Sequence, residues 1–205
     1  MSRHSARLVL ATRNAHKAEE LSRLLGGGAV VASLEAFPEF PETIEDRPTL
    51  EGNAEKKAVE AAIACGVWAL ADDTGLEVDA LSGAPGVLSA RWAGPGRTDA
   101  DNCAKLEREL SGVPVDRRQA RFRTVMALSD PLGRVERVEG RLEGSIALRP
   151  RGLGGFGYDP LFVLPDGRTL AELTADEKNA VSHRGKAFRL ILPRLKTVLQ
   201  AAAPL

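Results

Sequence analysis

The sequence has few cysteines, no surplus of either charge and no long apolar run. Its 205 residues include 2 cysteines, which argues against a disulfide framework and against a zinc site with several soft ligands at close spacing. Lys plus Arg and Asp plus Glu number 28 each, so the basic surplus typical of a nucleic-acid binder is missing, although a local basic pocket for a small anion stays open. No stretch approaches the roughly 20 apolar residues that span a bilayer, and the first apolar run is too short for a signal sequence. We therefore expect a soluble, reduced, cytoplasmic protein without a nucleic-acid or membrane partner.

Strand and helix patterns alternate along the chain. Asn14 and Thr49 are candidate N-caps of helices, and Gly26–Gly28 and Gly66 are candidate stops. We expect strands at 7–11, 29–34, 67–71 and 161–164, helices at 15–25, 50–65 and 98–110, a hairpin of 119–129 with 134–148, and a last helix capped by Ser182 that Pro193 should kink or split. The β-α-β-α-β opening followed by a hairpin predicts a mixed α/β sheet, with no linker long enough to separate domains.

The segment "LATRNAHKAEEL" runs from an expected strand through a polar turn into a helix. Free backbone N–H groups at the helix start, together with Lys17 in the first turn, favour an anion site suited to phosphates. The segment is not a Walker P-loop, because "GxxxxGK[ST]" does not occur in the chain. An ordinary capped surface helix would give the same pattern, so this segment alone leaves the two interpretations level.

The adjacent carboxylates Asp72 and Asp73 follow the apolar run "VWALA". Side chains alternate along a strand, so the two should point to opposite faces and only one can serve a given site. A carboxylate at a strand end is a suitable Mg²⁺ ligand, whereas an Asx-turn would need no ligand. Phosphatases of the haloacid-dehalogenase type need carboxylates at i and i+2, which weakens that interpretation. A second carboxylate could come from the acidic loop, which would otherwise be solvated surface and offers Glu42, Glu45, Asp46 and Glu51.

Two further segments combine flexible backbone, flat rings and cations. In "GGFGYDP" the glycines permit close approach of a ligand, and Phe156 and Tyr158 offer faces for a base, although such a loop is more often a turn with a core phenylalanine. In "ADEKNAVSHRGKA" the donors near the start of the last helix suit a polyphosphate or a purine oxygen, although a solvated helix start would look the same; they are Lys178, His183, Arg184 and Lys186.

Taken together and in this order, four segments resemble the inosine/xanthosine triphosphate pyrophosphatase family. They are "LATRNAHKAEEL", "LADDTGLEVDALSGAPGVLSARWAG", "GGFGYDPLFV" and "AELTADEKNAVSHRGKA". The resemblance implies Mg²⁺-dependent hydrolysis of ITP, dITP or XTP to the monophosphate and pyrophosphate, which removes non-canonical purines from the nucleotide pool. It also implies one domain over 1–205 with an elongated, twisted mixed sheet flanked by helices, two lobes around a deep central cleft, and a homodimer.

The resemblance assigns roles residue by residue. Asp73, rather than Asp72, falls on the catalytic carboxylate and metal ligand, and Glu45 falls on the metal-associated glutamate. The implied substrate-binding residues are Thr12, Arg13, Asn14, Ala15, His16, Lys17, Lys57, Thr74, Phe156, Gly157, Tyr158, Asp159, Lys178, His183 and Arg184. The chain departs from the family pattern at Arg13, where glycine is common, around Glu45, and at Pro193, so Glu51 stays an alternative to Glu45.

Three other functions remain to be separated from this one. A Maf-like pyrophosphatase acting on modified pyrimidine nucleotides would have a serine- and arginine-rich first loop, which "ATRNAHK" does not match. A non-catalytic nucleotide-binding module would have little use for a metal-binding carboxylate facing the phosphates. A phosphatase would release orthophosphate instead of pyrophosphate.

Overall fold

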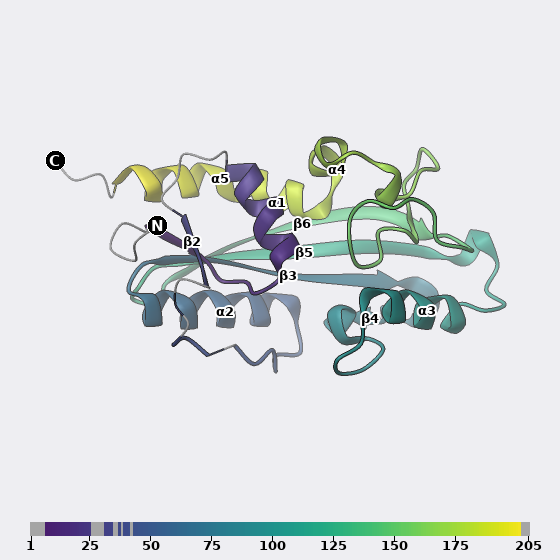
Figure 1. Ribbon diagram of the computed structural model, residues 1–205, viewed down its shortest axis with the longest axis horizontal. Coiled ribbons are helices and arrows are strands. Elements are labelled where there is room, and N and C mark those ends of the chain that lie inside the picture. Colours follow the sequence, from purple (N-terminus) through teal and green to yellow (C-terminus); the bar gives the residue numbers. More distant parts are fainter. Residues whose placement is uncertain (1–6, 26–30, 35–36, 38, 42, 202–205) are drawn as a thin grey trace. The chain divides into compact units, whose positions relative to one another are not determined.

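The computed structural model describes residues 7–25, 31–34, 37, 39–41 and 43–201 (Figure 1). Its sheet has the strand order β2-β1-β3-β5-β6-β7, with β4 paired to β3. Contacts divide the chain into two compact units: unit 1 holds Met1–Asp73, Thr124–Gly140 and Lys186–Leu205, and unit 2 holds Thr74–Arg123 and Arg141–Gly185. Among the described residues, no helix has the length and apolar character to cross a membrane. The single two-lobed domain over 1–205 stays a prediction.

Unit 1 is built on a parallel arrangement of short strands. β1 (Leu8–Leu10) pairs in parallel with β2 (Val31–Ser33) and with the start of β3 (Trp68–Val78). Helix α1 (Ala15–Leu25) and most of α5 (His183–Ala201) lie on one face of these strands, and α2 (Leu50–Cys65) lies on the other (Figure 1). The core of this unit gathers apolar side chains from β1, α1, β3 and α5, including Leu10, Leu21, Leu70, Phe188, Ile191 and Leu195.

The helices of unit 1 begin and end where their capping residues require. The Asn14 side chain accepts a hydrogen bond from the Lys17 N–H, and the Thr49 side chain accepts one from Gly52 N–H. Gly66 ends α2 in the left-handed conformation, with φ 67°. These caps confirm three of the expected helix boundaries; Gly26–Gly28, Ala29, Val30 and Glu42, which carry other expectations, lie outside the described residues.

Helix α5 is continuous through Pro193, so of the two expected effects of this proline the split is wrong, and the kink stays a prediction. The Ser182 hydroxyl caps its start by accepting from the Gly185 N–H at 3.0 Å. Phe188, Ile191 and Leu195 are buried along one side, as the apolar spacing predicts. Their burial stabilises the helix on both sides of the proline.

Unit 2 contains the second half of β3 and its own antiparallel pairs. β4 (Pro85–Gly86) pairs with β3, and β7 (Phe162–Val163) pairs with β6 (Val135–Ile146). Helix α3 (Asp99–Glu109) and helix α4 (Ala175–Val181) each begin with a reciprocal capping box, and short 3-10 helices cover Asp79–Leu81, Ser89–Arg91, Val115–Arg117 and Leu170–Glu172. The core of this unit includes Leu76, Leu106, Phe122, Tyr158 and Phe162.

The sequence patterns predicted most elements but misplaced two. The expected hairpin is present as β5 (Gln119–Ser129) and β6, joined by a turn in which Asp130 N–H donates to the Arg134 carbonyl. Strand β3, however, continues to Val78, so Asp72 and Asp73 lie inside the strand and not at its end. Lys178, expected near the start of the last helix, lies on α4, a separate helix that the sequence patterns did not predict. The predicted mixed α/β sheet flanked by helices is confirmed.

Candidate active site

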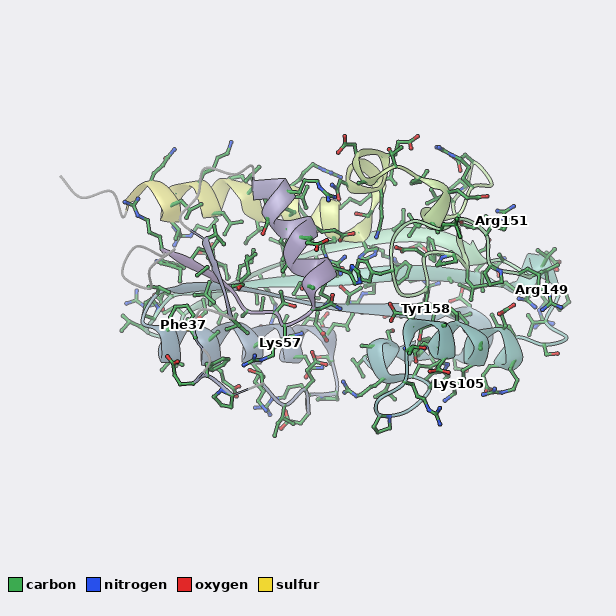
Figure 2. The ribbon with its side chains drawn as sticks, viewed as in Figure 1. Phe37, Lys57, Lys105, Arg149, Arg151 and Tyr158 are labelled. Atoms are coloured by element: carbon green, nitrogen blue, oxygen red, sulfur yellow. The ribbon has the colours of Figure 1, made fainter. Side chains whose placement is uncertain are left out.

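Asp72 and Asp73 form ion pairs with lysines from two different helices. Lys17 Nζ of α1 lies 3.1 Å from Asp72 Oδ2, and Lys57 Nζ of α2 lies 2.9 Å from Asp73 Oδ1. The side chains of Asp72 and Asp73 are 0% and 8% exposed. Because α1 and α2 cover opposite faces of unit 1 (Figures 1 and 2), the two carboxylates point to opposite faces, as strand alternation predicts. The pair is tolerated inside β3 because each charge is neutralised.

Lys57 also joins Asp73 to the acidic loop. Its ammonium donates to Glu45 Oε1 at 2.8 Å and to Asp73 Oδ1 at 2.9 Å, so one cation holds carboxylates from two segments together. Asn53, fully buried one turn earlier on α2, donates to Asp73 Oδ2 at 3.4 Å and accepts from the Arg47 N–H at 3.0 Å. Glu45 is thereby brought beside Asp73, whereas its neighbour Asp46 pairs with Lys56 on the surface.

Burial controls the charges in this cluster. Burial raises the pKa of the Asp73 carboxyl above its usual range, and the attraction of Lys57 offsets only part of that rise. Burial also opposes the charged form of Lys57, but the carboxylates of Asp73 and Glu45 outweigh it and the pKa of Lys57 is raised. Lys57 is therefore a firmly held cation at neutral pH.

The loop before α1 is more exposed. Thr12 Oγ1 accepts from the Asn14 N–H at 3.2 Å, and Arg13 donates to the Phe40 carbonyl at 2.7 Å. Arg13, Asn14, Ala15 and His16 are exposed, and Lys17 is partly buried against Asp72. The turn therefore presents a helix N-terminus and exposed polar groups next to a lysine, which is the arrangement that favours an anion.

In unit 2, Asp159 fixes the glycine-aromatic loop. Its Oδ2 accepts from the Phe156 N–H at 2.8 Å and from Lys178 Nζ at 2.7 Å, and the Asp159 side chain is 5% exposed. Lys178 Nζ also lies 4.5 Å from the centroid of the Phe156 ring, and Arg184 Cζ lies 5.4 Å from it. Asp159 thus acts on Phe156 and Lys178, and these two residues present the ring and the cation.

Further anchors hold the same loop to the rest of unit 2. The Gly157 N–H donates to Asp99 Oδ2 at 2.8 Å, and the Cys103 thiol donates to the Gly157 carbonyl at 3.3 Å. Burial raises the pKa of Cys103 to about 12, so this thiol stays protonated as a donor. Tyr158, labelled in Figure 2, is buried and donates its hydroxyl to the Ser89 carbonyl at 2.9 Å. Tyr158 is therefore a structural anchor, and Phe156 is the ring left at the loop surface.

The remaining predicted residues, Arg184 and His183, are both buried but contact different neighbours. Arg184 is 2% exposed and donates to Thr74 Oγ1 at 3.2 Å. His183 is 3% exposed and stacks on Phe122, with ring centroids 4.6 Å apart. Thr74 and Arg184 both belong to unit 2, so this hydrogen bond lies within that unit.

Sequence reasoning omitted Asn53, Asp99 and Cys103 from the site. Asn53 precedes Lys57 by four residues on α2, and this i, i+4 spacing places the two on one face of the helix. That spacing was available in the sequence and would have identified Asn53. The contacts of Asp99 and Cys103 with Gly157 join residues more than 50 positions apart, so only the structure reveals them.

The donor set around Asp73 suits a hard cation such as Mg²⁺. Glu45 and Asp73 already converge on one positive group, and carboxylate oxygens are what Mg²⁺ takes from protein. Within the described part of the chain, no group of three or more His, Cys, Asp or Glu side chains could hold a metal. Mg²⁺ is usually bound by one or two carboxylates of the protein, and substrate phosphates and water complete its coordination shell.

Fold and site together define an α/β protein that presents buried carboxylates, their lysine partners and an aromatic loop with cations beside it. The Ham1 family model matches residues 8–194, and the chain belongs to the Ham1 family. It is 54% identical over 185 residues to the dITP/XTP pyrophosphatase of Desulforamulus reducens, covering 89% of this chain and 92% of that protein, and 52% identical over 191 residues to that of Geobacter sulfurreducens, covering 92% and 96%. A HAM1 protein from Coxiella burnetii has a similar structure, with a TM-score of 0.82, 41% identity, and coverage of 96% of this chain and 100% of that one.

Proposed function

We propose that this protein hydrolyses non-canonical purine nucleoside triphosphates, namely ITP, dITP and XTP, to the monophosphate and pyrophosphate. It is a hydrolase of phosphoric anhydride bonds, as its dITP/XTP pyrophosphatase relatives are named. It works with Mg²⁺, as a homodimer in the cytoplasm, and cleanses the nucleotide pool. The observation that carries the proposal is the convergence of Glu45 and Asp73 on one buried lysine.

The triphosphate is held by the cationic groups of the first loop and of α2. Exposed N–H groups at the start of α1, with Lys17 and Lys57, supply positive charge for a polyphosphate. Mg²⁺ held by Glu45 and Asp73 would neutralise the charge that develops on the leaving pyrophosphate. Phosphoryl-type transfer depends mainly on positioning and electrostatics, so the chain needs no covalent intermediate.

Asp73 positions the attacking water. A free aspartate, with a pKa of about 3.9, is a poor base at neutral pH. Burial raises the pKa of Asp73, but as a metal ligand Asp73 works better by orienting and polarising a metal-associated water than by removing a proton unaided. Asn53 donates to Asp73 Oδ2 at 3.4 Å, which helps to hold the carboxylate in one orientation toward the water.

The base is held by Phe156 and by the cations over its ring, Lys178 and Arg184. Phe156 offers a flat face for stacking, and Arg184 or loop N–H groups donate to the 6-keto oxygen that hypoxanthine and xanthine carry. Adenine has an amino group there, which would leave those donors unpaired, and such a site rejects the analogue strongly. Guanine shares the 6-keto group, so its exclusion requires a clash or an unpaired group at its 2-position.

One assay tests the proposal. Purified protein is incubated with Mg²⁺ and separately with ITP, dTTP and ATP, and pyrophosphate and orthophosphate are both quantified. We expect pyrophosphate from ITP and little product from dTTP or ATP. Orthophosphate as the product would indicate a phosphatase, preference for a pyrimidine nucleotide would indicate a Maf-like enzyme, and binding without turnover would indicate a nucleotide-binding module. Each of these outcomes contradicts the proposal.

A further inference from the structure

Lys57 holds the position at which the two metal-binding carboxylates meet. Its ammonium lies 2.8 Å from Glu45 Oε1 and 2.9 Å from Asp73 Oδ1, and its side chain is 11% exposed. The same two carboxylates are the proposed ligands of Mg²⁺. In this structure, the Lys57 ammonium therefore neutralises the two carboxylates that are proposed to bind the metal.

A divalent ion and this ammonium compete for the same oxygens. Two positive charges a few ångströms apart repel strongly in a partly buried site, because its effective dielectric constant is far below that of water. A metal that binds Glu45 and Asp73 must therefore weaken or break the contacts of Lys57. The displaced ammonium then needs another anion, because an unpaired charge in a largely buried position is costly.

We infer that Lys57 acts as a built-in competitor of the metal, and that it moves from Glu45 and Asp73 to the triphosphate when metal and nucleotide bind together. This inference rests on the proposed function. It makes metal binding weak without nucleotide and strong with it, because the nucleotide supplies the phosphates that receive the lysine. Such coupling is reciprocal, so metal must strengthen nucleotide binding by the same factor.

The chain contains a matched control for this role. Lys17 is also a partly buried lysine paired with a β3 aspartate, at 3.1 Å, but its partner Asp72 points to the opposite face of the strand. Removing Lys17 takes away one positive charge from the neighbourhood without vacating the position between Glu45 and Asp73. Any difference between the two lysine variants therefore isolates the direct competition.

The test measures metal binding without turnover. Mn²⁺ replaces Mg²⁺ as a paramagnetic ion that also takes oxygen ligands, and electron paramagnetic resonance of free Mn²⁺ reports its affinity for the nucleotide-free full-length protein. We expect Lys57→Met to bind Mn²⁺ at least about tenfold more tightly than the wild type, because an ion pair with low exposure no longer opposes the metal. Lys17→Met should change the affinity by less than about threefold, through screened long-range charge alone. Lys57→Arg, which keeps the charge, should bind Mn²⁺ no more tightly than the wild type.

A second measurement tests the coupling. The Mn²⁺ titration is repeated with a non-hydrolysable α,β-methylene analogue of ITP, and the ratio of affinities with and without the analogue is compared. Direct chelation of Mn²⁺ by the analogue is common to all proteins, so a smaller ratio for Lys57→Met than for wild type supports the transfer of Lys57 to the phosphates. Circular dichroism checks the fold, and Lys57→Gln provides the same test if the Met variant does not fold.

The inference is overturned if folded Lys57→Met or Lys57→Gln binds Mn²⁺ as weakly as the wild type, if Lys57→Arg binds it as tightly as Lys57→Met, or if Lys17→Met tightens binding equally. It is also overturned if the ratio of Mn²⁺ affinities with and without the analogue is the same for Lys57→Met as for the wild type. None of these results bears on whether the wild type releases pyrophosphate from ITP, so failure of the inference and failure of the proposed function are distinguishable.

Discussion

Asp72 and Asp73 are adjacent residues of the same type that have different ion-pair partners. Asp72 is fully enclosed beside Lys17, whereas Asp73 shares Lys57 with Glu45 and receives Asn53. Asp73 has a second carboxylate, Glu45, next to it through Lys57, and a metal site needs that convergence. The difference between the two residues therefore comes from which helix each faces, and their position in the strand decides that.

Replacing Asp73 should stop turnover and leave the fold intact. We expect Asp73→Asn to lower kcat by at least about a hundredfold, because an amide neither neutralises a metal nor polarises a metal-associated water as a carboxylate does. Lys57 keeps Glu45 as a partner at 2.8 Å, so the variant should remain folded. Steady-state release of pyrophosphate from ITP and thermal unfolding give the two readouts.

Asp72→Asn is the control for Asp73→Asn, because it removes the same charge one residue away. We expect a smaller loss of kcat and a larger loss of stability, since Lys17 then faces an uncharged, buried partner. Equal losses of kcat for the two variants would contradict the separate roles, and near wild-type turnover by Asp73→Asn would remove Asp73 from catalysis.

Phe156 should contribute mainly to binding of the base. Base stacking on an aromatic side chain is worth about 1–3 kcal/mol, so Phe156→Ala should raise KM for ITP between about fivefold and about a hundredfold with little change in kcat. Phe156→Tyr keeps the flat face and should stay close to wild type. An unchanged KM in the alanine variant would show that the base does not stack on this ring.

At the scale of elements, the loop that carries Phe156 is held by its glycines as much as by its side chains. Gly155 has φ 72°, and a Cβ there would meet the Asp159 carboxylate more closely than real Cβ atoms approach. Gly112 has φ 80° but faces open space. An alanine at either position would have the strain of a left-handed backbone, but only at Gly155 would its Cβ also clash with a neighbouring side chain.

We therefore expect Gly112→Ala to cost about 1 kcal/mol of unfolding free energy, from backbone strain alone. Gly155→Ala should cost about 1–3 kcal/mol more because of overpacking against Asp159. It should also raise KM for ITP, since Asp159 holds Phe156 and Lys178, whereas Gly112→Ala should not. Urea unfolding and steady-state kinetics measure both effects, and equal costs for the two variants would refute the role of the contact.

Elements with local caps could be predicted from sequence, and elements fixed by distant partners could not. Asn14, Thr49, Thr98 and Ser182 act within three residues of their own position, so the starts of four helices were readable. The continuation of β3 through Asp72 and Asp73 depends on Lys17 and Lys57, which lie 55 and 16 positions away. Without those partners, two adjacent aspartates indicate the end of a strand.

The sequence identified the family, but it did not reveal the contacts that arrange the candidate site. The order of the four segments identified the family and the residue types, but not that Asp159 and Tyr158 hold the loop from within. Helix α4 was missed although Thr174 and Glu177 form a capping box that is visible in the sequence. Lys178, which directly follows that glutamate, was consequently placed near the last helix without a helix of its own.

At the scale of the whole molecule, stability should fall in acid because of carboxylates that cap helices. Asp101, Glu172 and Glu177 accept hydrogen bonds from the backbone N–H groups of Thr98, Thr169 and Thr174, and these bonds lower the pKa of each carboxyl. For Glu177 the pKa falls from 4.5 to about 2. All three carboxyls therefore bind protons more readily in the unfolded chain than in the folded one.

The sign of the pH dependence follows from this difference. Stabilisation by Glu177 is complete above pH 4.5 and is lost as the pH falls from 4.5 to about 2, so the unfolding free energy should decline over that interval. Glutamine also fits a capping box but does not titrate, and Glu177→Gln should therefore show a smaller difference in unfolding free energy between pH 7 and pH 3. Glu109→Gln, which removes an exposed glutamate from the last turn of α3, serves as the control and should follow the wild type. Urea titrations at the two pH values measure the differences, and an equal decline in wild type and Glu177→Gln would show that this cap does not contribute to acid unfolding.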